Sequence, residues 1–121
     1  MINDDGYHTM NKFGLYTDKP SISFESHLQG LEEQTRASFV DIRDYVKSLG
    51  ENVIEEFRPH RVVYAKSLTF RTFLDIQPKK DSLIVSIKHS RKESPKVLTV
   101  NNIQQVEDIK SQIRNAYQTI S

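Results

Sequence analysis

Residues 61–88 read RVVYAKSLTFRTFLDIQPKKDSLIVSIK, and this stretch decides the fold. Its first part, Arg61–Lys66, is β-branched and aromatic, and its middle part, Phe70–Gln77, alternates apolar and polar residues. Residues 82–89 alternate in the same way. A period of two is typical of strands with one buried face. Because Pro and Asp suit a turn, Pro78–Asp81 predicts a tight connection between the second and third of these strands, which are therefore antiparallel neighbours.

Two further strands flank this stretch. The first lies at residues 53–57, where Val53, Glu55 and Phe57 alternate with Ile54 and Glu56, and Pro59 then ends the pattern. Lys96–Val100 follows a polar, charged loop and predicts a short last strand. Consecutive strands joined by short connections predict an antiparallel meander of about five strands.

Helices are predicted both before and after the strands in the chain. The first runs from about Glu33 to Leu49, and a shorter one begins near Ser23 or Ser26 and ends around Gly30. Gly50 stands where a left-handed C-cap is expected. The apolar residues of the first helix recur at helical spacing, and they are Phe39, Ile42, Val46 and Leu49.

The clearest helical pattern lies at the end of the chain, with Asn101 or Asn102 as its N-cap. Its single apolar stripe consists of Val106, Ile109, Ile113, Ala116 and Ile120. The predicted fold class is therefore α+β, an antiparallel meander of about five strands flanked by an N-terminal and a C-terminal helix that pack on one face. We expect residues 1–24 to be a flexible N-terminal extension and residues 25–121 to be a single α+β domain.

The amino-acid composition restricts the cellular location and the kinds of functional site that we expect. The chain has 121 residues and no cysteine, so disulfides and thiolate sites are excluded. No apolar run has the length that a membrane span or a signal peptide needs. We therefore expect a cytoplasmic protein that makes no membrane contact.

Charge is distributed unevenly along the chain. Residues 1–60 contain 6 basic and 11 acidic residues, whereas residues 61–121 contain 11 basic and 5 acidic residues. The most basic part is residues 58–96, with ten Lys or Arg and three acidic residues. Such a segment suits phosphates or an acidic partner, although it is equally typical of the solvent face of strands and turns.

No catalytic or cofactor site is evident in the sequence. The four glycines are isolated, and the four histidines are dispersed, so neither a phosphate loop nor a metal-binding pair is indicated. Glu55, Asp75 and Lys79 loosely match the acidic–acidic–lysine pattern of restriction-type nucleases, but Lys79 sits in a Pro-led turn. We expect no enzyme, no metal and no cofactor, with a degenerate metal-dependent nuclease as an alternative.

The predicted site is a binding face on the sheet. If Phe70, Thr72, Leu74 and Ile76 face the helices, then Arg71, Phe73, Asp75 and Gln77 face away from them. Exposed aromatics among cations suit single-stranded nucleic acid, and they suit a protein partner or a homodimer equally well. The candidate face comprises Tyr64, Lys66, Arg71, Phe73, Lys79, Lys80, Lys88, Arg91 and Lys92.

Two alternatives remain open for the aromatic residues of this face. Either Tyr64 and Phe73 belong to the core, or they are covered by a second chain, a ligand or the N-terminal segment that contains Phe13, Leu15 and Tyr16. An exposed large apolar side chain is unfavourable by roughly 1.5–3 kcal/mol relative to a buried one, which is why we expect a cover.

Several short motifs resemble one family. A helix ends in Ser48-Leu49-Gly50, one strand contains Tyr64, and another contains Phe73 and ends at Pro78 before a basic pair, while the terminal helix has Ala116-Tyr117 near its end. Over roughly residues 28–120 the chain resembles small bacterial and archaeal domains labelled "predicted transport protein". Members occur alone or as the last domain behind nuclease or restriction-type domains.

The resemblance implies a nucleic-acid context without an activity. We therefore expect a non-catalytic binding module that acts through protein–protein contact or as an accessory to nucleic-acid-processing machinery. Direct nucleic-acid binding through the basic and aromatic sheet face is the alternative hypothesis.

Overall fold

The computed structural model describes residues 9–10, 16–17 and 22–120. Thr9–Met10 (β1) pairs with Tyr16–Thr17 (β2) in a two-stranded sheet. The remaining elements, in chain order, are α1 (Phe24–Leu28), α2 (Glu33–Ser48), β3 (Val53–Arg58), β4 (Arg61–Lys66), β5 (Arg71–Lys79), β6 (Ser82–Ile87), β7 (Lys96–Val100) and α3 (Ile103–Thr119).

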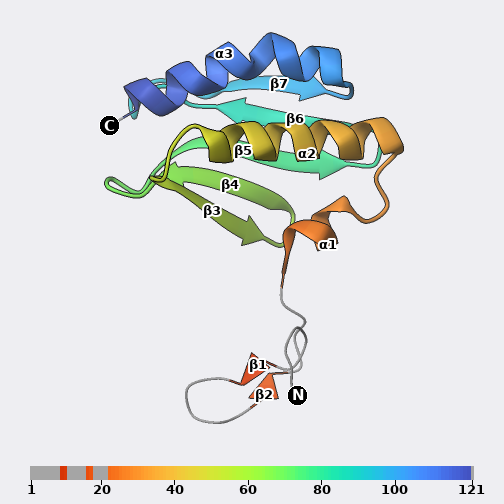
Figure 1. Cartoon of the computed structure of the whole chain (residues 1–121). Coiled ribbons are helices and arrows are strands. Elements are labelled where there is room, and N and C mark those ends of the chain that lie inside the picture. The colour runs from red at the N-terminus through yellow and green to blue at the C-terminus, as the bar shows by residue number, and fades with distance from the viewer. Residues whose placement is uncertain (1–8, 11–15, 18–21, 121) are drawn as a thin grey trace.

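The main sheet is an antiparallel meander. Its strand order is β3-β4-β5-β6-β7, so every strand pairs with its neighbour in the chain. Figure 1 shows α2 and α3 lying side by side across one face of this sheet, while no helix of the described residues covers the other face. The predicted α+β meander with an N-terminal and a C-terminal helix on one face is confirmed.

One core holds the two layers together. Phe39, Ile42 and Val46 of α2 are fully buried, as are Val106 and Ile113 of α3, so both predicted apolar stripes face the sheet. Burial of a full aliphatic or aromatic side chain contributes roughly 1.5–3 kcal/mol. The helices are therefore stabilised mainly by this shared interface, to which the sheet contributes inward residues such as Val62, Leu74, Ile76, Leu83, Val85 and Ile87.

A β-bulge changes the side-chain alternation of β5. Tyr64 of β4 pairs with Leu74, but the next residue, Ala65, pairs with Thr72, so Phe73 is an extra residue in the ladder. Because of the bulge, Phe73 and Leu74 are both fully buried. The predicted alternation, in which Phe73 faces away from the helices, is therefore wrong for the part of β5 before Leu74. The strand begins at Arg71, which pairs with Lys66, so Phe70 lies in the preceding loop.

The end of α2 also differs from its prediction. The helix ends at Ser48, its C-cap Leu49 is right-handed, and Gly30 is the only glycine with positive φ in the described part of the chain. Gly50 is therefore not a left-handed cap. Instead, the Tyr117 hydroxyl of α3 comes so close to Gly50 that a Cβ there would lie 2.6 Å from its oxygen.

The first and last helices begin with side-chain caps. Ser23 and Ser26 form a capping box at α1, and Asn102 accepts a hydrogen bond from the backbone N–H of Gln105 at the start of α3. Phe24, which the sequence assigned to the extension, is buried in the core against Phe39. The expected cover by Phe13 and Leu15 lies outside the described residues, as does most of the predicted extension.

Candidate functional site

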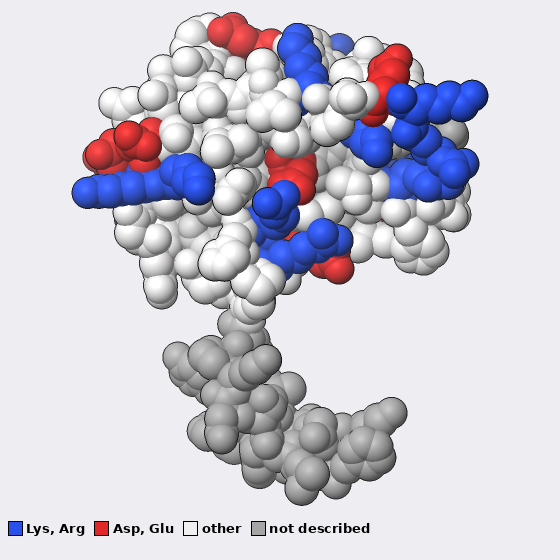
Figure 2. All heavy atoms as spheres, turned by 180° about the vertical axis from the view of Figure 1, so that it is seen from behind, with Lys and Arg blue, Asp and Glu red and all other residues white. Residues whose placement is uncertain are grey.

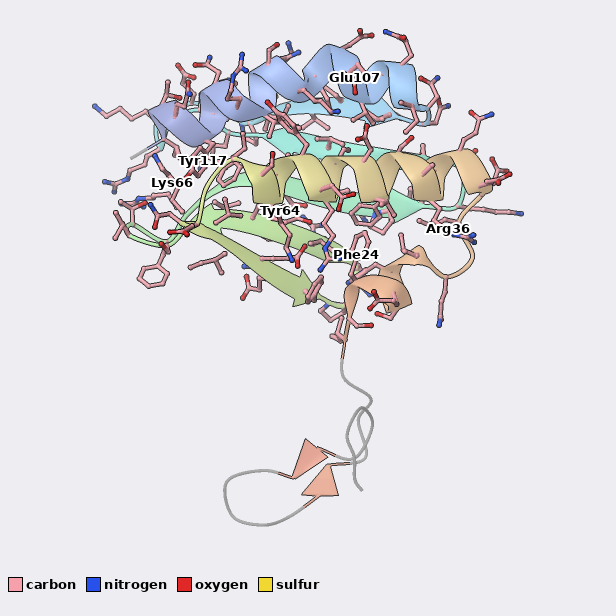
Figure 3. The ribbon with its side chains drawn as sticks, viewed as in Figure 1. Phe24, Arg36, Tyr64, Lys66, Glu107 and Tyr117 are labelled. Carbon is pink, nitrogen blue, oxygen red and sulfur yellow. The ribbon has the colours of Figure 1, made fainter. Side chains whose placement is uncertain are left out.

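The two aromatic residues of the predicted binding face are core residues. Tyr64 and Phe73 have no exposed surface. Tyr64 lies beneath α2 (Figure 3), and the ring of Phe73 packs edge-on against Tyr117 of α3, with 5.3 Å between ring centroids. The prediction that they form an open aromatic face is wrong, because the bulge turns Phe73 inward with Leu74. Neither ring is available to stack on a base.

Tyr64 belongs to a partly buried polar network between α2 and the sheet. Its hydroxyl donates a hydrogen bond to Glu55 at 2.8 Å, and Arg43 donates two more to the same carboxylate, at 2.8 and 3.0 Å. Lys47 completes the group at 3.3 Å, and the Arg43 guanidinium also lies 4.3 Å from the ring centroid of Phe24. Every oxygen of Glu55 is thus paired, which is the condition for a buried charge to be tolerated.

The network shifts two pKa values in opposite directions. Burial alone would raise the pKa of Glu55, but hydrogen bonds from Arg43 and Tyr64 outweigh burial and hold it below its usual value. Burial raises the pKa of Tyr64, and its hydrogen bond to the Glu55 carboxylate raises it further. A tyrosine that keeps its proton and a fully paired carboxylate act as structural groups.

The two carboxylates of the nuclease alternative do not converge. Glu55 pairs across the ladder with Tyr64 and faces the helices, whereas Asp75 pairs with Val63 on the opposite face. There, Asp75 forms an ion pair with Arg61 at 2.9 Å. A shared Mg²⁺ needs both carboxylates on one side of the sheet, so this pair does not fit a two-carboxylate metal site.

Several predicted cations do converge, at the end of the sheet where β5 begins. The backbone N–H of Lys88, just after β6, donates to the Phe73 carbonyl at 3.0 Å and fixes Lys88 beside β5. A pocket of about 330 Å³ opens here. We call it the basic pocket, and its lining residues are Phe70, Arg71, Thr72, Lys88, Arg91 and Ile120.

Lys66 lies next to the basic pocket but is engaged by the protein itself. Its ammonium donates to the main-chain carbonyl of Ile120 at 3.1 Å and lies 5.2 Å from the ring centroid of Tyr117. Figure 3 labels Lys66 and Tyr117 at this end of α3. A cation at the last carbonyls of a helix is favourable because of the helix dipole. Lys66 therefore holds the end of α3 against the sheet, and Arg71, Lys88 and Arg91 are the pocket's cations.

Two large apolar side chains are exposed in the loop that leads into β5, and one of them, Phe70, lines the pocket with these cations. Leu68 and Phe70, in the β4–β5 loop, have 81% and 76% of their surface exposed. Phe70 also has φ 55, the left-handed region that a bulky residue rarely adopts. In Figure 2 the largest group of blue side chains gathers at the right, the end that carries this loop. Sequence alternation had placed Phe70 inside, so this exposed aromatic was missed.

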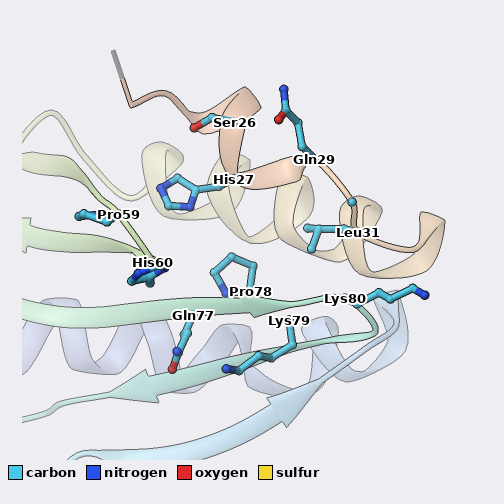
Figure 4. Close-up of a pocket in the computed structure, with 11 residues that line it drawn as sticks. Ser26, His27, Gln29, Leu31, Pro59, His60, Gln77, Pro78, Lys79 and Lys80 are labelled. Carbon is cyan, nitrogen blue, oxygen red and sulfur yellow. The ribbon is translucent and has the colours of Figure 1, made fainter. Parts of the chain in front are cut away.

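The other predicted lysines lie at the far end of β5. Lys79 is the last of the nine residues of β5, and Arg71 is the first. Because a strand rises about 3.3 Å per residue, the two residues lie about 26 Å apart along the strand. A cleft of about 400 Å³ separates α1 from this end of the sheet, with His27, His60 and Leu31 among its lining. Lys79 and Lys80 both line this cleft, and in Figure 4 the side chain of Lys79 extends from β5 on the side away from α1. Lys79 and Lys80 thus do not share a surface with the basic pocket.

Lys92, the last predicted cation, lies in the loop that follows β6 and is exposed, but it does not line the basic pocket. Within the described ranges, no three His, Asp or Glu side chains are grouped as a metal site would need. In the same part of the chain, none of the helices has both the length and the apolar character to cross a membrane.

Comparison with protein-family models finds no match. No curated protein and no solved structure is similar to the chain either. The resemblance to the "predicted transport protein" domains thus stays a prediction.

Proposed function

We propose that this chain is a non-catalytic binding module that contacts an acidic segment of a protein partner through the basic pocket. The observation that carries the proposal is the exposed Phe70, held at φ 55 beside three cations. A left-handed conformation of a bulky residue is unfavourable by about 1–3 kcal/mol, and such strain clusters at functional sites. An aromatic with adjacent arginines is also the composition that recurs at interface hot spots.

The surface favours a protein over nucleic acid as the partner. Tyr64 and Phe73 are buried and cannot stack on bases. The pocket cations are gathered at one end, and the pair Lys79 and Lys80 is about 26 Å away by strand length, so no continuous track for a phosphate backbone joins them. The aliphatic Leu68 suits the apolar side chain of a peptide.

Two other expectations accompany this proposal. An accessory role beside nucleic-acid-processing machinery agrees with a protein-binding module and stays a prediction, as does a cytoplasmic location. A homodimer is tested by the mass of the chain in solution.

Fluorescence anisotropy with short labelled probes tests the proposal. A Glu-rich peptide with a central Leu should bind at low salt, and a neutral peptide of the same length should not. The Lys88→Ala/Arg91→Ala variant should lose this binding, whereas Lys79→Ala/Lys80→Ala removes the same charge at the far end and should keep it.

Two results would overturn the proposal. If neither peptide binds at low salt, the basic pocket is not a peptide site. If an oligothymidylate binds and the peptide does not, with affinity falling at a log–log slope of about 0.7 per neutralised phosphate, direct nucleic-acid binding replaces it.

A further inference from the structure

The basic pocket is unbalanced in charge. Arg71, Lys88 and Arg91 line it, and no carboxylate of the described residues does. In the described part of the chain, none of these three side chains takes part in an ion pair. By contrast, Arg43, Arg58 and Arg61 each have a carboxylate partner. The pocket therefore gathers three cations that have no ion-pair partner among the described residues.

Arg71 has a buried donor that nothing in the described structure accepts. Its Nε is shielded from solvent and lacks a hydrogen-bond partner. A buried, unpaired donor is unfavourable, and more so when the group is charged. The guanidinium is a planar fork that matches two oxygens of one anion. Arg71 is thus suited to an oxyanion that enters the pocket.

The charge and size of the pocket favour a phosphate over a carboxylate. A carboxylate brings one negative charge and two oxygens, whereas a phosphate monoester brings a charge of about −1.5 to −2 and three strong acceptor oxygens. Three cations around about 330 Å³ match the second group better. Thr72 also lines the pocket, and its hydroxyl is a neutral hydrogen-bond donor.

Resting on the proposed function, we propose that the basic pocket binds a phosphorylated side chain of the protein partner. Arg71 holds two phosphate oxygens, Lys88 and Arg91 neutralise the remaining charge, and Phe70 and Leu68 contact apolar residues that flank the phosphorylated one. Recognition of a phosphorylated segment by clustered arginines is a recurring binding mode. Free phosphate and a 5′-phosphorylated oligonucleotide present the same group without those flanking contacts.

Three peptides with one sequence test this inference. The Glu-rich peptide is made with a central Ser, phosphoserine or Glu, each beside the same Leu. We expect the phosphoserine peptide to bind about tenfold or more tightly than the Ser peptide, since new charge-assisted hydrogen bonds form, and the Glu peptide to recover only part of that gain.

A conservative variant separates geometry from charge. Arg71→Lys keeps the positive charge but removes the planar fork, so it should abolish most of the preference for phosphoserine while still binding the Ser peptide. Lys79→Ala/Lys80→Ala serves as the control and should retain the preference. Thermal unfolding of each variant, monitored by circular dichroism, confirms that it is folded.

Each contrary result points to a different failure. Equal affinity for the three peptides contradicts the phosphate inference and leaves the acidic-segment module intact. No binding of any peptide contradicts both. A third result would contradict the choice of a peptide ligand: inorganic phosphate or 5′-phosphorylated oligothymidylate binds as tightly as the phosphoserine peptide, and Arg71→Lys weakens that binding to the same extent. The pocket would then bind the phosphate group alone.

Discussion

The hydroxyl oxygen of Tyr117 occupies the space that a side chain at Gly50 would need. A Cβ built on Gly50 lies 2.6 Å from this oxygen and 3.5 Å from the ring carbon that bears it. Tyr117 is fixed by its edge-on contact with Phe73 and by the ammonium of Lys66 near its ring. The loop after α2 and the last turns of α3 thus meet at a position where any side chain larger than that of glycine requires Tyr117 to shift.

Substitution of Gly50 by alanine should therefore destabilise the fold, by about 1–3 kcal/mol, as overpacking does. Urea unfolding measures the change. The double variant Gly50→Ala/Tyr117→Phe removes the clashing oxygen and should recover most of the loss, because the ring carbon then lies at an ordinary contact distance. Additive losses in the double variant would show that the clash is not the cause.

Tyr64→Phe should lower the free energy of unfolding by about 1–2 kcal/mol, since the Glu55 carboxylate loses one of its partly buried hydrogen bonds. Tyr117→Phe is the matched control, because no hydrogen bond of its hydroxyl is found among the described residues. Chemical denaturation of both variants compares the two hydroxyls. A smaller loss in Tyr64→Phe than in Tyr117→Phe would contradict the network.

The stabilisation from Glu55 should disappear in acid. Because its pKa is lower in the folded state than its usual value of 4.5, the ionised carboxylate stabilises the fold fully above that pH, and the contribution is lost as pH falls further. The free energy difference between wild type and Glu55→Gln should therefore be largest near neutral pH and shrink below about pH 4.5. A difference independent of pH would show that Glu55 contributes by packing alone.

His27 predicts a separate loss of stability at mildly acidic pH. It is 7% exposed, and its Nε2 has no partner in the described structure. Burial lowers its pKa from 6.5, and the nearby His60 lowers it further, although a hydrogen bond to the Arg58 backbone acts the other way. As pH falls through 6.5, the unfolded chain takes up the proton first, so stability decreases.

The melting temperature of wild type and of His27→Phe, followed from about pH 7.5 to about pH 5.5, tests this assignment. The variant keeps an aromatic ring against Phe57, which stacks on His27 at 6.4 Å between ring centroids. Its melting temperature should fall less than that of wild type over this range. Parallel curves would assign the acid sensitivity to other groups.

Phe70→Gly should make the protein more stable and a weaker binder. Glycine adopts φ 55 without strain, which stabilises the folded variant, whereas the greater flexibility of glycine stabilises its unfolded chain. The net increase in the free energy of unfolding should be up to about 1 kcal/mol. Loss of the aromatic ring removes the apolar contact with the peptide. Denaturation and anisotropy on the same sample measure both effects. Unchanged peptide affinity would exclude Phe70 from the site.

Most of the fold could be predicted because its pattern is local. The strand Arg61–Lys66 has the predicted bounds, and the apolar stripes of α2 and α3 both face the core. Asn102, one of two candidates, caps α3. Each of these features depends on neighbouring residues and on a period of two or 3.6.

The candidate site could be predicted only in part, because it depends on register and on long-range packing. A single extra residue, Phe73, reverses which side of β5 its neighbours occupy, and alternation alone does not reveal a bulge. Arg71 and Lys88 meet because the hydrogen bond from Lys88 to Phe73 joins two strands. Basic composition indicated cations in this region of the sequence, but not which of them converge.

The central claim is that the basic pocket, not the open face of the sheet, is the binding surface. A titration of the ¹⁵N-labelled chain with the Glu-rich phosphoserine peptide, followed by two-dimensional amide NMR, tests it most directly. We predict the largest shift changes at the backbone amides of Phe70, Arg71, Lys88 and Arg91, with little change at Lys79 and Lys80. Shift changes centred on Val63, Asp75 and Ser86 of the open face, or none at all, would contradict the account.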